Sequence, residues 1–120
     1  MEHLSEQSIA SAIEQCQNND KYIVLIVART WQRADYWSKY IADKYSFAFK
    51  YITKNKFTCV NGSMIYLISQ SANTHGRRAD LILYDTRLDY ETSCILEYIE
   101  NRPTPFKLNR IMEEQTNDEI

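Results

Sequence analysis

Two stretches decide the fold of this chain: Asn61-Gly-Ser-Met-Ile-Tyr-Leu-Ile-Ser69 and Ala79-Asp-Leu-Ile-Leu-Tyr-Asp85. The first predicts a β-hairpin, because an Asn-Gly pair between two β-prone runs is the strongest short-range signal for one, and both turn residues are expected at positive φ. Its strands would be residues 57–60 and 63–69. The second stretch predicts a short apolar strand with an aspartate near each end, reached through a polar loop over residues 71–78.

Helices and strands are expected to alternate around these two stretches. Residues 22–28 form a continuous β-branched apolar run, which is typical of a strand buried on both faces in the middle of a parallel sheet. Helical spacing of apolar residues, together with capping residues such as Thr30, predicts helices before and after this run. Helices are expected over residues 5–17, 31–45, 91–101 and 106–114, and a further strand over residues 47–51.

The order of these elements predicts a single α/β domain with a mixed central sheet, a β-hairpin and flanking helices. The strands at 22–28 and 79–84 are expected at the centre of the sheet, and the hairpin at its edge. Residues 1–114 would form this domain, and residues 115–120 a disordered acidic tail. A hydrophobic content of 44% in 120 residues is enough for one core and one domain.

Composition argues against several classes of function. The formal net charge of −2 implies no general electrostatic attraction to nucleic acid or to an anionic membrane. Only two glycines occur, Gly62 and Gly76, so there is no glycine-rich phosphate-binding loop, and no cofactor is expected. The widely spaced Cys16, Cys59 and Cys94 predict reduced, mostly buried thiols rather than a zinc site, which is typical of a cytoplasmic protein. No apolar run has the length of a membrane span, so no membrane partner is expected.

One part of the chain resembles a known family. The run Ile23-Val-Leu-Ile-Val-Ala-Arg-Thr30, followed by an aromatic-rich helix, is similar to the second strand and helix in the ATPase core of the large terminase, the motor that packages viral DNA, and of related helicase-type ATPases. Three later phrases extend the resemblance: Asn61-Gly-Ser-Met-Ile65, His75-Gly-Arg-Arg78 and Asp80-Leu-Ile-Leu-Tyr-Asp85. The resemblance covers about residues 22–86 and implies a protein of viral or mobile-element type.

The chain departs from the family's pattern at the positions that catalysis would need. The segment before residue 22, where the family carries its phosphate-binding loop, is here a helix without glycine. In the family the last of these strands ends in an Asp-Glu pair that holds Mg²⁺ and orients the attacking water, whereas here Thr86 follows Asp85. The resemblance therefore implies a degenerate relative that has lost phosphoryl transfer and kept its fold as a binding scaffold.

Basic side chains on the hairpin edge and in the following loop form the candidate contact site for nucleic acid or a protein partner: Lys54, Lys56, His75, Arg77 and Arg78. With Lys50 they would make a positive strip beside Tyr51 and Phe57, able to contact phosphates and to stack bases. The alternative interpretation is that the lysines protect an edge strand from aggregation and that the histidine is a solvated loop residue. No residue is expected to act in catalysis.

The sequence therefore predicts a small non-catalytic binding protein of viral type that acts through a nucleic-acid or protein contact surface. Inhibition of a host nucleic-acid-processing or defence complex is one form of this function. The alternative is a metal-dependent nuclease or an accessory subunit of a composite ATPase, with Asp80 and Asp85 as metal ligands and Arg78 acting on phosphate. The odd spacing of the two aspartates argues against one shared metal, because it places them on opposite faces of an ideal strand.

Overall fold

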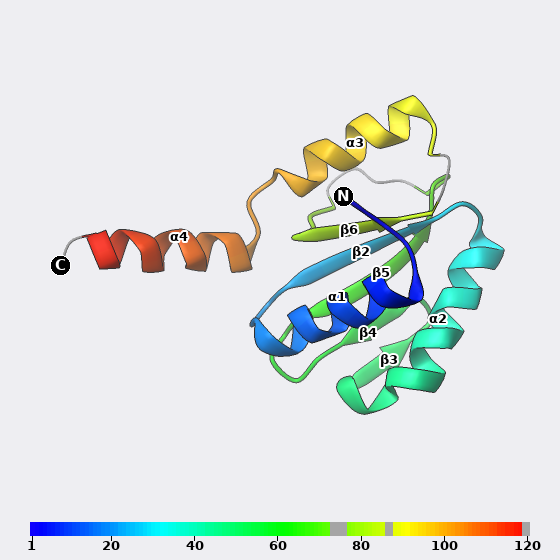
Figure 1. The fold of residues 1–120 in the computed structure, drawn as a ribbon, viewed down its shortest axis with the longest axis horizontal. Coiled ribbons are helices and arrows are strands. Elements are labelled where there is room, and N and C mark those ends of the chain that lie inside the picture. The colour runs from blue at the N-terminus through cyan, green and yellow to red at the C-terminus, as the bar shows by residue number, and fades with distance from the viewer. Residues whose placement is uncertain (73–76, 86–87, 119–120) are drawn as a thin grey trace.

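A mixed sheet forms the centre of the protein, with six strands in the order β1-β6-β2-β5-β4-β3 within the described part of the chain (Figure 1). The computed structural model describes residues 1–72, 77–85 and 88–118, with side chains as far as residue 113. β1, β6, β2 and β5 are parallel, whereas β4 and β3 are antiparallel additions beside β5. The elements in chain order are β1 (Glu2–His3), α1 (Glu6–Asn18), β2 (Ile23–Ala28), α2 (Trp31–Tyr45), η1 (Ser46–Ala48), β3 (Tyr51–Thr53), β4 (Lys56–Thr58), β5 (Met64–Ser69), β6 (Leu81–Tyr84), α3 (Tyr90–Glu100) and α4 (Pro105–Asp118).

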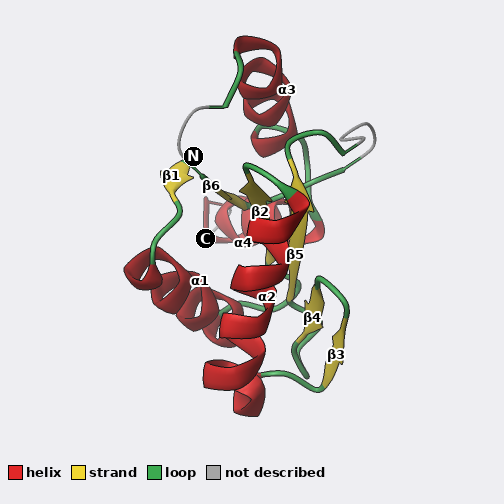
Figure 2. Ribbon diagram, turned by 90° about the vertical axis from the view of Figure 1, so that its right-hand side faces the viewer, coloured by secondary structure: helices red, strands yellow, loops and turns green. Residues whose placement is uncertain are grey.

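β2 lies between β5 and β6, and its side chains alternate between two hydrophobic clusters. Val24 and Ile26 belong to the cluster that α1 and α2 cover, and Leu25 and Val27 belong to the cluster that α3 covers. Figure 2 shows α1 and α2 on one side of the sheet, with α3 separate from them. The prediction of a strand buried on both faces is confirmed, and so are the α/β class and the mixed sheet.

Three of the helices begin at a side chain that accepts a hydrogen bond from a backbone N–H three residues later: Ser5 for α1, Thr30 for α2 and Asp89 for α3. Such caps satisfy N–H groups that the first turn of a helix leaves unpaired, which is why short polar residues mark these starts in the sequence. The three predicted helices therefore match α1, α2 and α3 closely. α4 continues to Asp118, past residue 114 where the sequence predicted its end.

The hairpin between β4 and β5 is confirmed, but its Asn-Gly turn differs from the prediction. Gly62 has a positive φ of 87°, whereas Asn61 is not among the described residues with positive φ. The Asn61 side chain instead caps the end of α1, because its Nδ2 donates to the carbonyl oxygens of Cys16 at 2.8 Å and of Asn19 at 3.2 Å. Its Oδ1 accepts a hydrogen bond from the Ser63 backbone N–H at 3.0 Å. One side chain thus joins a helix end to the hairpin, 45 residues apart in sequence.

The predicted strand over residues 47–51 is wrong. Ser46–Ala48 continues α2 as a 3₁₀ turn, and the strand begins only at Tyr51. The alternation that suggested a strand has another cause, because Phe49 packs on Phe57 with ring centroids 5.0 Å apart while Phe47 is 77% exposed.

The sequence predicted the hairpin at the edge of the sheet, and this prediction is wrong. β5 pairs with β2 along its whole length, from the pair Ile23 and Met64 to the pair Ala28 and Ser69. A second hairpin, turned at Asn55 with a φ of 62°, places β3 at the edge instead. The strand at 79–84 is confirmed as β6, which has β1 on its outer side; β1 has only two residues and no sequence signal predicted it.

The order of the strands decides which face of the sheet each connection crosses. The connections through α1 and α2 both move across the sheet in one direction, and both lie on the same face. The connection from β5 to β6 returns in the opposite direction, and a right-handed crossover then requires the other face. The residues just before β6 therefore pass over the face on which α3 lies, and Ala79 is buried in its cluster.

Replacement of Asn61 by alanine is expected to lower the free energy of unfolding by about 1–3 kcal/mol, because the carbonyl oxygens of Cys16 and Asn19 at the end of α1 lose the hydrogen bonds from its side chain. Urea unfolding followed by circular dichroism measures this change. Val60→Ala is the control, since Val60 is the neighbouring residue and 83% exposed, and its effect should stay within about 0.5 kcal/mol. Equal stability of both variants and the wild type would contradict the capping role.

Candidate functional site: the open face of the sheet

In the described part of the chain, no helix packs on one half of the sheet face that α3 partly covers, and we call this half the open face. Residues paired directly across neighbouring strands point to the same side of a sheet, so the register identifies its members. None of them is fully buried, whereas Phe57 and Ile65 on the opposite face have no exposed surface. The open face comprises Ile23, Tyr51, Thr53, Lys56, Thr58, Met64 and Tyr66.

Two tyrosines on the open face each lie under a lysine ammonium group. The Lys56 Nζ is 5.5 Å from the centroid of the Tyr66 ring, and the Lys50 Nζ is 5.2 Å from that of Tyr51. Tyr51 is 60% exposed and lies on the edge strand β3, while Tyr66 is half-buried on β5. The open face therefore carries two pairs of an aromatic ring and a cation, and the two rings lie two strands apart.

A cavity of about 310 Å³ adjoins Tyr66 at the point where the open face meets the returning chain. Its apolar side consists of Ile23, Leu25 and Tyr66, and its charged side consists of Arg77 and Arg78. Arg77 is half-buried and Arg78 is exposed. An apolar wall with a few charged groups is typical of a small-molecule site, and the two arginines favour a negatively charged ligand.

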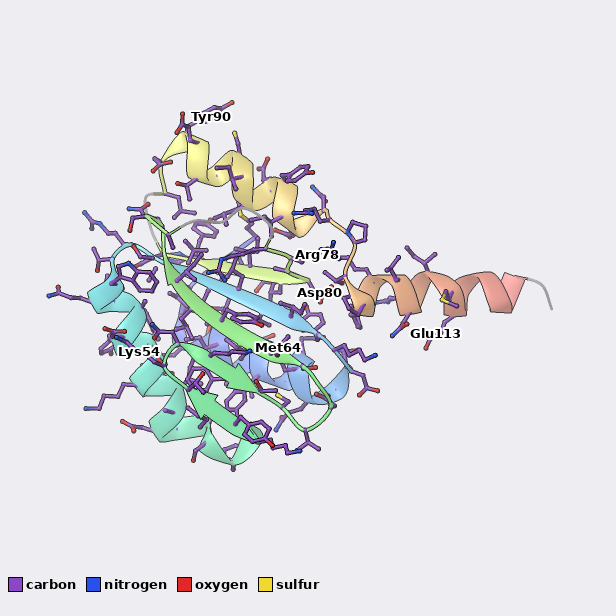
Figure 3. The ribbon with its side chains drawn as sticks, turned by 180° about the vertical axis from the view of Figure 1, so that it is seen from behind. Lys54, Met64, Arg78, Asp80, Tyr90 and Glu113 are labelled. Atoms are coloured by element: carbon purple, nitrogen blue, oxygen red, sulfur yellow. The ribbon has the colours of Figure 1, made fainter. Side chains whose placement is uncertain are left out.

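Three of the five predicted contact residues come together around Tyr66: Lys56 on β4, and Arg77 and Arg78 before β6. Lys54 lies at the turn between β3 and β4, at the left of Figure 3 and away from Arg78 near its centre. His75 lies outside the described residues. In the described part of the chain, no carboxylate lies within ion-pair distance of Lys56 or Arg78.

The aromatic partner of this basic group is Tyr66, which the sequence prediction missed. Phe57, which it named, has no exposed surface and faces the helices on the other side of the sheet. The alternation of β5 separates Tyr66 from its buried neighbours Ile65 and Leu67, and this is a signal that the sequence did contain. What the sequence lacked was the register that sets Lys56 opposite Tyr66.

Asp80 holds structural hydrogen bonds at the start of β6. Its Oδ2 accepts from the Ile23 backbone N–H at 2.8 Å, and its own N–H donates to the Ile23 carbonyl oxygen at 2.8 Å. Its Oδ1 accepts from the Thr104 hydroxyl, which in turn accepts from the Lys107 backbone N–H at 3.1 Å and so caps α4. Asp80 thus joins β2, β6 and α4.

Asp85 lies at the other end of β6, where it is 6% exposed. Its carboxylate forms an ion pair with the Arg33 guanidinium and accepts a bond of 3.4 Å from the Arg29 backbone N–H. The two aspartates that the alternative interpretation assigned to a metal therefore lie at opposite ends of a strand, each with partners from other segments. Among the described residues, no group of three or more His, Cys, Asp or Glu side chains could hold a metal ion.

Two of the three cysteines belong to the cluster that α1 and α2 cover. Cys16 and Cys59 are buried, and a hydrogen bond with Cys59, together with burial, raises the pKa of the Cys16 thiol above its ordinary value. Cys94, predicted as a small core residue, is instead exposed on α3.

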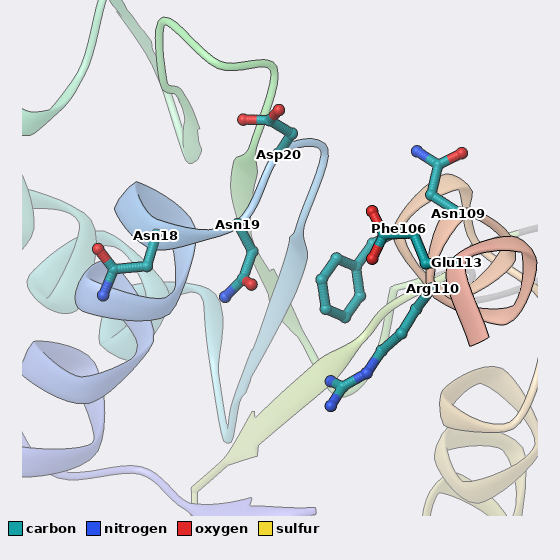
Figure 4. Close-up of a pocket in the computed structure, with 7 residues that line it drawn as sticks. All are labelled: Asn18, Asn19, Asp20, Phe106, Asn109, Arg110 and Glu113. Carbon is teal, nitrogen blue, oxygen red and sulfur yellow. The ribbon is translucent and has the colours of Figure 1, made fainter. Parts of the chain in front are cut away.

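A second cavity, of about 480 Å³, lies between the end of α1 and the projecting helix α4 (Figure 4). Phe106 and Arg110 extend from α4 toward it, and the Phe106 ring meets Tyr22 edge-on at 5.0 Å between centroids. Its lining is mostly exposed and polar, and it mixes acidic with basic side chains: Asn18, Asn19, Asp20, Phe106, Asn109, Arg110 and Glu113. It therefore lacks the single sign of charge that Arg77 and Arg78 give to the cavity beside Tyr66.

No protein family, no curated protein sequence and no solved structure matches this chain. In the part of the chain that the structure describes, no helix is both long enough and apolar enough to span a membrane.

Replacement of Asp85 by alanine is expected to lower the free energy of unfolding by about 1–3 kcal/mol, because the buried carboxylate loses its ion pair with the half-exposed Arg33 and its backbone hydrogen bond. The same urea titration measures it, and Asp35→Ala, an exposed aspartate on α2, is the matched control. Millimolar Mg²⁺ or Mn²⁺ should leave the wild-type unfolding midpoint unchanged. A cation-dependent rise that disappears in Asp85→Ala would instead support a metal site.

Proposed function

We propose that this protein binds single-stranded nucleic acid on the open face, without catalysis. The observation that carries the proposal is the cluster around Tyr66: Lys56 above its ring, and Arg77 and Arg78 across the adjoining cavity. Lysine and arginine attract phosphates, and every base has a face that can stack on a tyrosine. The neighbouring strands β4 and β5 supply both kinds of contact, through Lys56 and Tyr66.

A single strand fits this surface better than a duplex. Tyr51 and Tyr66 can stack only on bases that are not already stacked within a double helix. A sheet face that carries aromatic side chains is also a recurring platform for two or three unstacked bases. The net charge of −2 for the whole chain limits nonspecific attraction, so binding would depend on the local group of cations.

The absence of catalysis is supported by the partners of the two acids. Asp80 is bonded to Ile23 and Thr104, and Asp85 to Arg33, so neither carboxylate is available as a ligand without loss of structural contacts. The resemblance to the terminase ATPase core belongs to the same proposal: a scaffold of viral type that has lost phosphoryl transfer and retains a surface for nucleic acid. Interference with a host nucleic-acid complex is one use of such a surface.

Removal of either tyrosine ring should weaken binding by about 1–3 kcal/mol, the usual contribution of one stacked base. Fluorescence anisotropy with labelled single-stranded DNA and RNA measures this for Tyr51→Ala and for Tyr66→Leu, which keeps an apolar side chain in the cluster beneath. Tyr36→Ala is the control, because Tyr36 is also 60% exposed but lies on α2. Equal losses in Tyr51→Ala and Tyr36→Ala would place the binding site elsewhere.

The Lys56→Ala variant should bind single strands less tightly and with a weaker dependence on salt. Removal of one phosphate contact lowers the slope of log affinity against log salt by about 0.7 for a single strand. Lys39→Ala on α2 makes the same change of charge away from the open face, and its slope should equal that of the wild type. Failure of the wild type to bind any single strand at low salt would reject the proposed function and direct the search to a protein partner.

A further inference from the structure

The open face ends abruptly at the cavity beside Tyr66. Beyond it, the chain just before β6 is fixed to β2 by the paired hydrogen bonds between Asp80 and Ile23, both of 2.8 Å. Farther along the same face, α3 covers Leu25 and the rest of the second cluster with Leu96 and Ile99. A strand that crosses the open face from Tyr51 toward Tyr66 therefore meets the returning chain and α3, and its path along the sheet stops there.

Two arginines lie at this end of the open face. Arg77 and Arg78 are consecutive, and both line a cavity whose other described lining residues are Ile23, Leu25 and Tyr66, with the tyrosine hydroxyl as their one polar side-chain group. That hydroxyl already donates to the Met64 sulfur at 3.3 Å, so the polar recognition in the cavity falls to the guanidinium groups. Together Arg77 and Arg78 carry two positive charges, one more than the single negative charge of an internal phosphodiester.

A terminal phosphate monoester matches this arrangement better. It carries about 1.5 to 2 negative charges at neutral pH and three acceptor oxygens, so it can engage both guanidinium forks. The adjoining base can lie against Tyr66 and the apolar wall, in a volume of about 310 Å³. Lys56, whose Nζ lies 5.5 Å from the centroid of the Tyr66 ring, can hold the next phosphate on the open-face side.

We infer that the cavity receives the phosphorylated end of a single strand, with the terminal phosphate on Arg77 and Arg78 and the last base against Tyr66. This inference rests on the proposed function and deepens it: the protein binds strand ends rather than any position along a strand. Phosphate monoesters occur at 5′ and at 3′ ends, and the chemistry of the cavity is the same for both. The experiment therefore includes both.

The test compares oligonucleotides of one sequence, about 12 nucleotides long so that they cover one site. They carry a 5′-phosphate, a 3′-phosphate or only hydroxyl ends, and their affinities for the wild type are measured by anisotropy with an internal label. We expect one phosphorylated form to bind about ten times more tightly than the hydroxyl form, because its terminal phosphate adds charge-assisted hydrogen bonds to the guanidinium groups. A circularised strand, which has no end, should bind no better than the hydroxyl form.

Arg77→Lys/Arg78→Lys is the decisive variant, because it keeps both charges and removes the forked geometry. It should bind the hydroxyl form nearly as well as the wild type does, and lose most of the preference for the phosphorylated end. Tyr51→Ala, at the far end of the open face, should weaken all forms alike and keep the preference. Circular dichroism of each variant checks that the fold is intact.

The outcomes separate this inference from the function it rests on. Equal binding of phosphorylated and hydroxyl forms, with losses in Tyr51→Ala and Tyr66→Leu, would overturn end recognition and leave single-strand binding in place. A preference for phosphate that survives in Arg77→Lys/Arg78→Lys would also overturn it, because the end would then be bound elsewhere. Absence of binding to every oligonucleotide would reject both.

Discussion

The burial of β2 on both faces is the constraint on which the rest of the structure depends. Its apolar side chains alternate between two clusters, so each face of the sheet must be covered at this strand. A helix is about 10 Å wide and strands are about 4.8 Å apart, so one helix covers about two strands. α1 and α2 together cover one face, but α3 alone serves the other, and β3, β4 and part of β5 remain uncovered there. The open face is thus a consequence of how few helices lie on that side.

Polar side chains fasten this arrangement at points where chain segments far apart in sequence meet. Asn61 joins the end of α1 to the hairpin, Asp80 joins β2 to β6 and α4, and Asp85 joins β6 to the start of α2 through Arg33. In each case a carboxylate or amide satisfies backbone groups, or a charge, that the elements leave unpaired. Aspartates at strand ends resemble catalytic acids in the sequence, yet their partners here give them a structural explanation.

The topology of the sheet places the basic residues of the loop beside an aromatic residue of a strand. The connection from β5 to β6 has to return over β2 on the face that α1 and α2 do not occupy, and this brings Arg77 and Arg78 against Tyr66. The antiparallel pairing of β4 with β5 brings Lys56 to the same ring from the other side. Neither contact involves neighbours in sequence, and together they turn scattered positive charges into one surface.

The sequence by itself determined the local elements of this protein, because their signals are local. The apolar run of β2, the spacing of Ile9, Ile13 and Cys16 in α1, and the cap at Thr30 are read from residues within one or two turns of each other. It also identified Lys56, Arg77 and Arg78 as candidates, since their charge needs no structure to be recognised. The sequence did not predict the 3₁₀ turn after α2, because Phe47 and Phe49 follow the spacing of a strand although only Phe49 packs against the core.

Only the tertiary structure decided which of these candidates act together. The register of β4 against β5 places Tyr66 rather than Phe57 on the open face, since a shift of one residue would exchange the two faces. The position of Lys54 at the turn between β3 and β4 sets it apart from Arg78 (Figure 3), and the bond from Ile23 to Asp80 fixes the returning chain at one end of the open face. Such choices depend on pairings between residues distant along the chain, and these are fixed by the collective burial of both faces of β2 rather than by any local pattern.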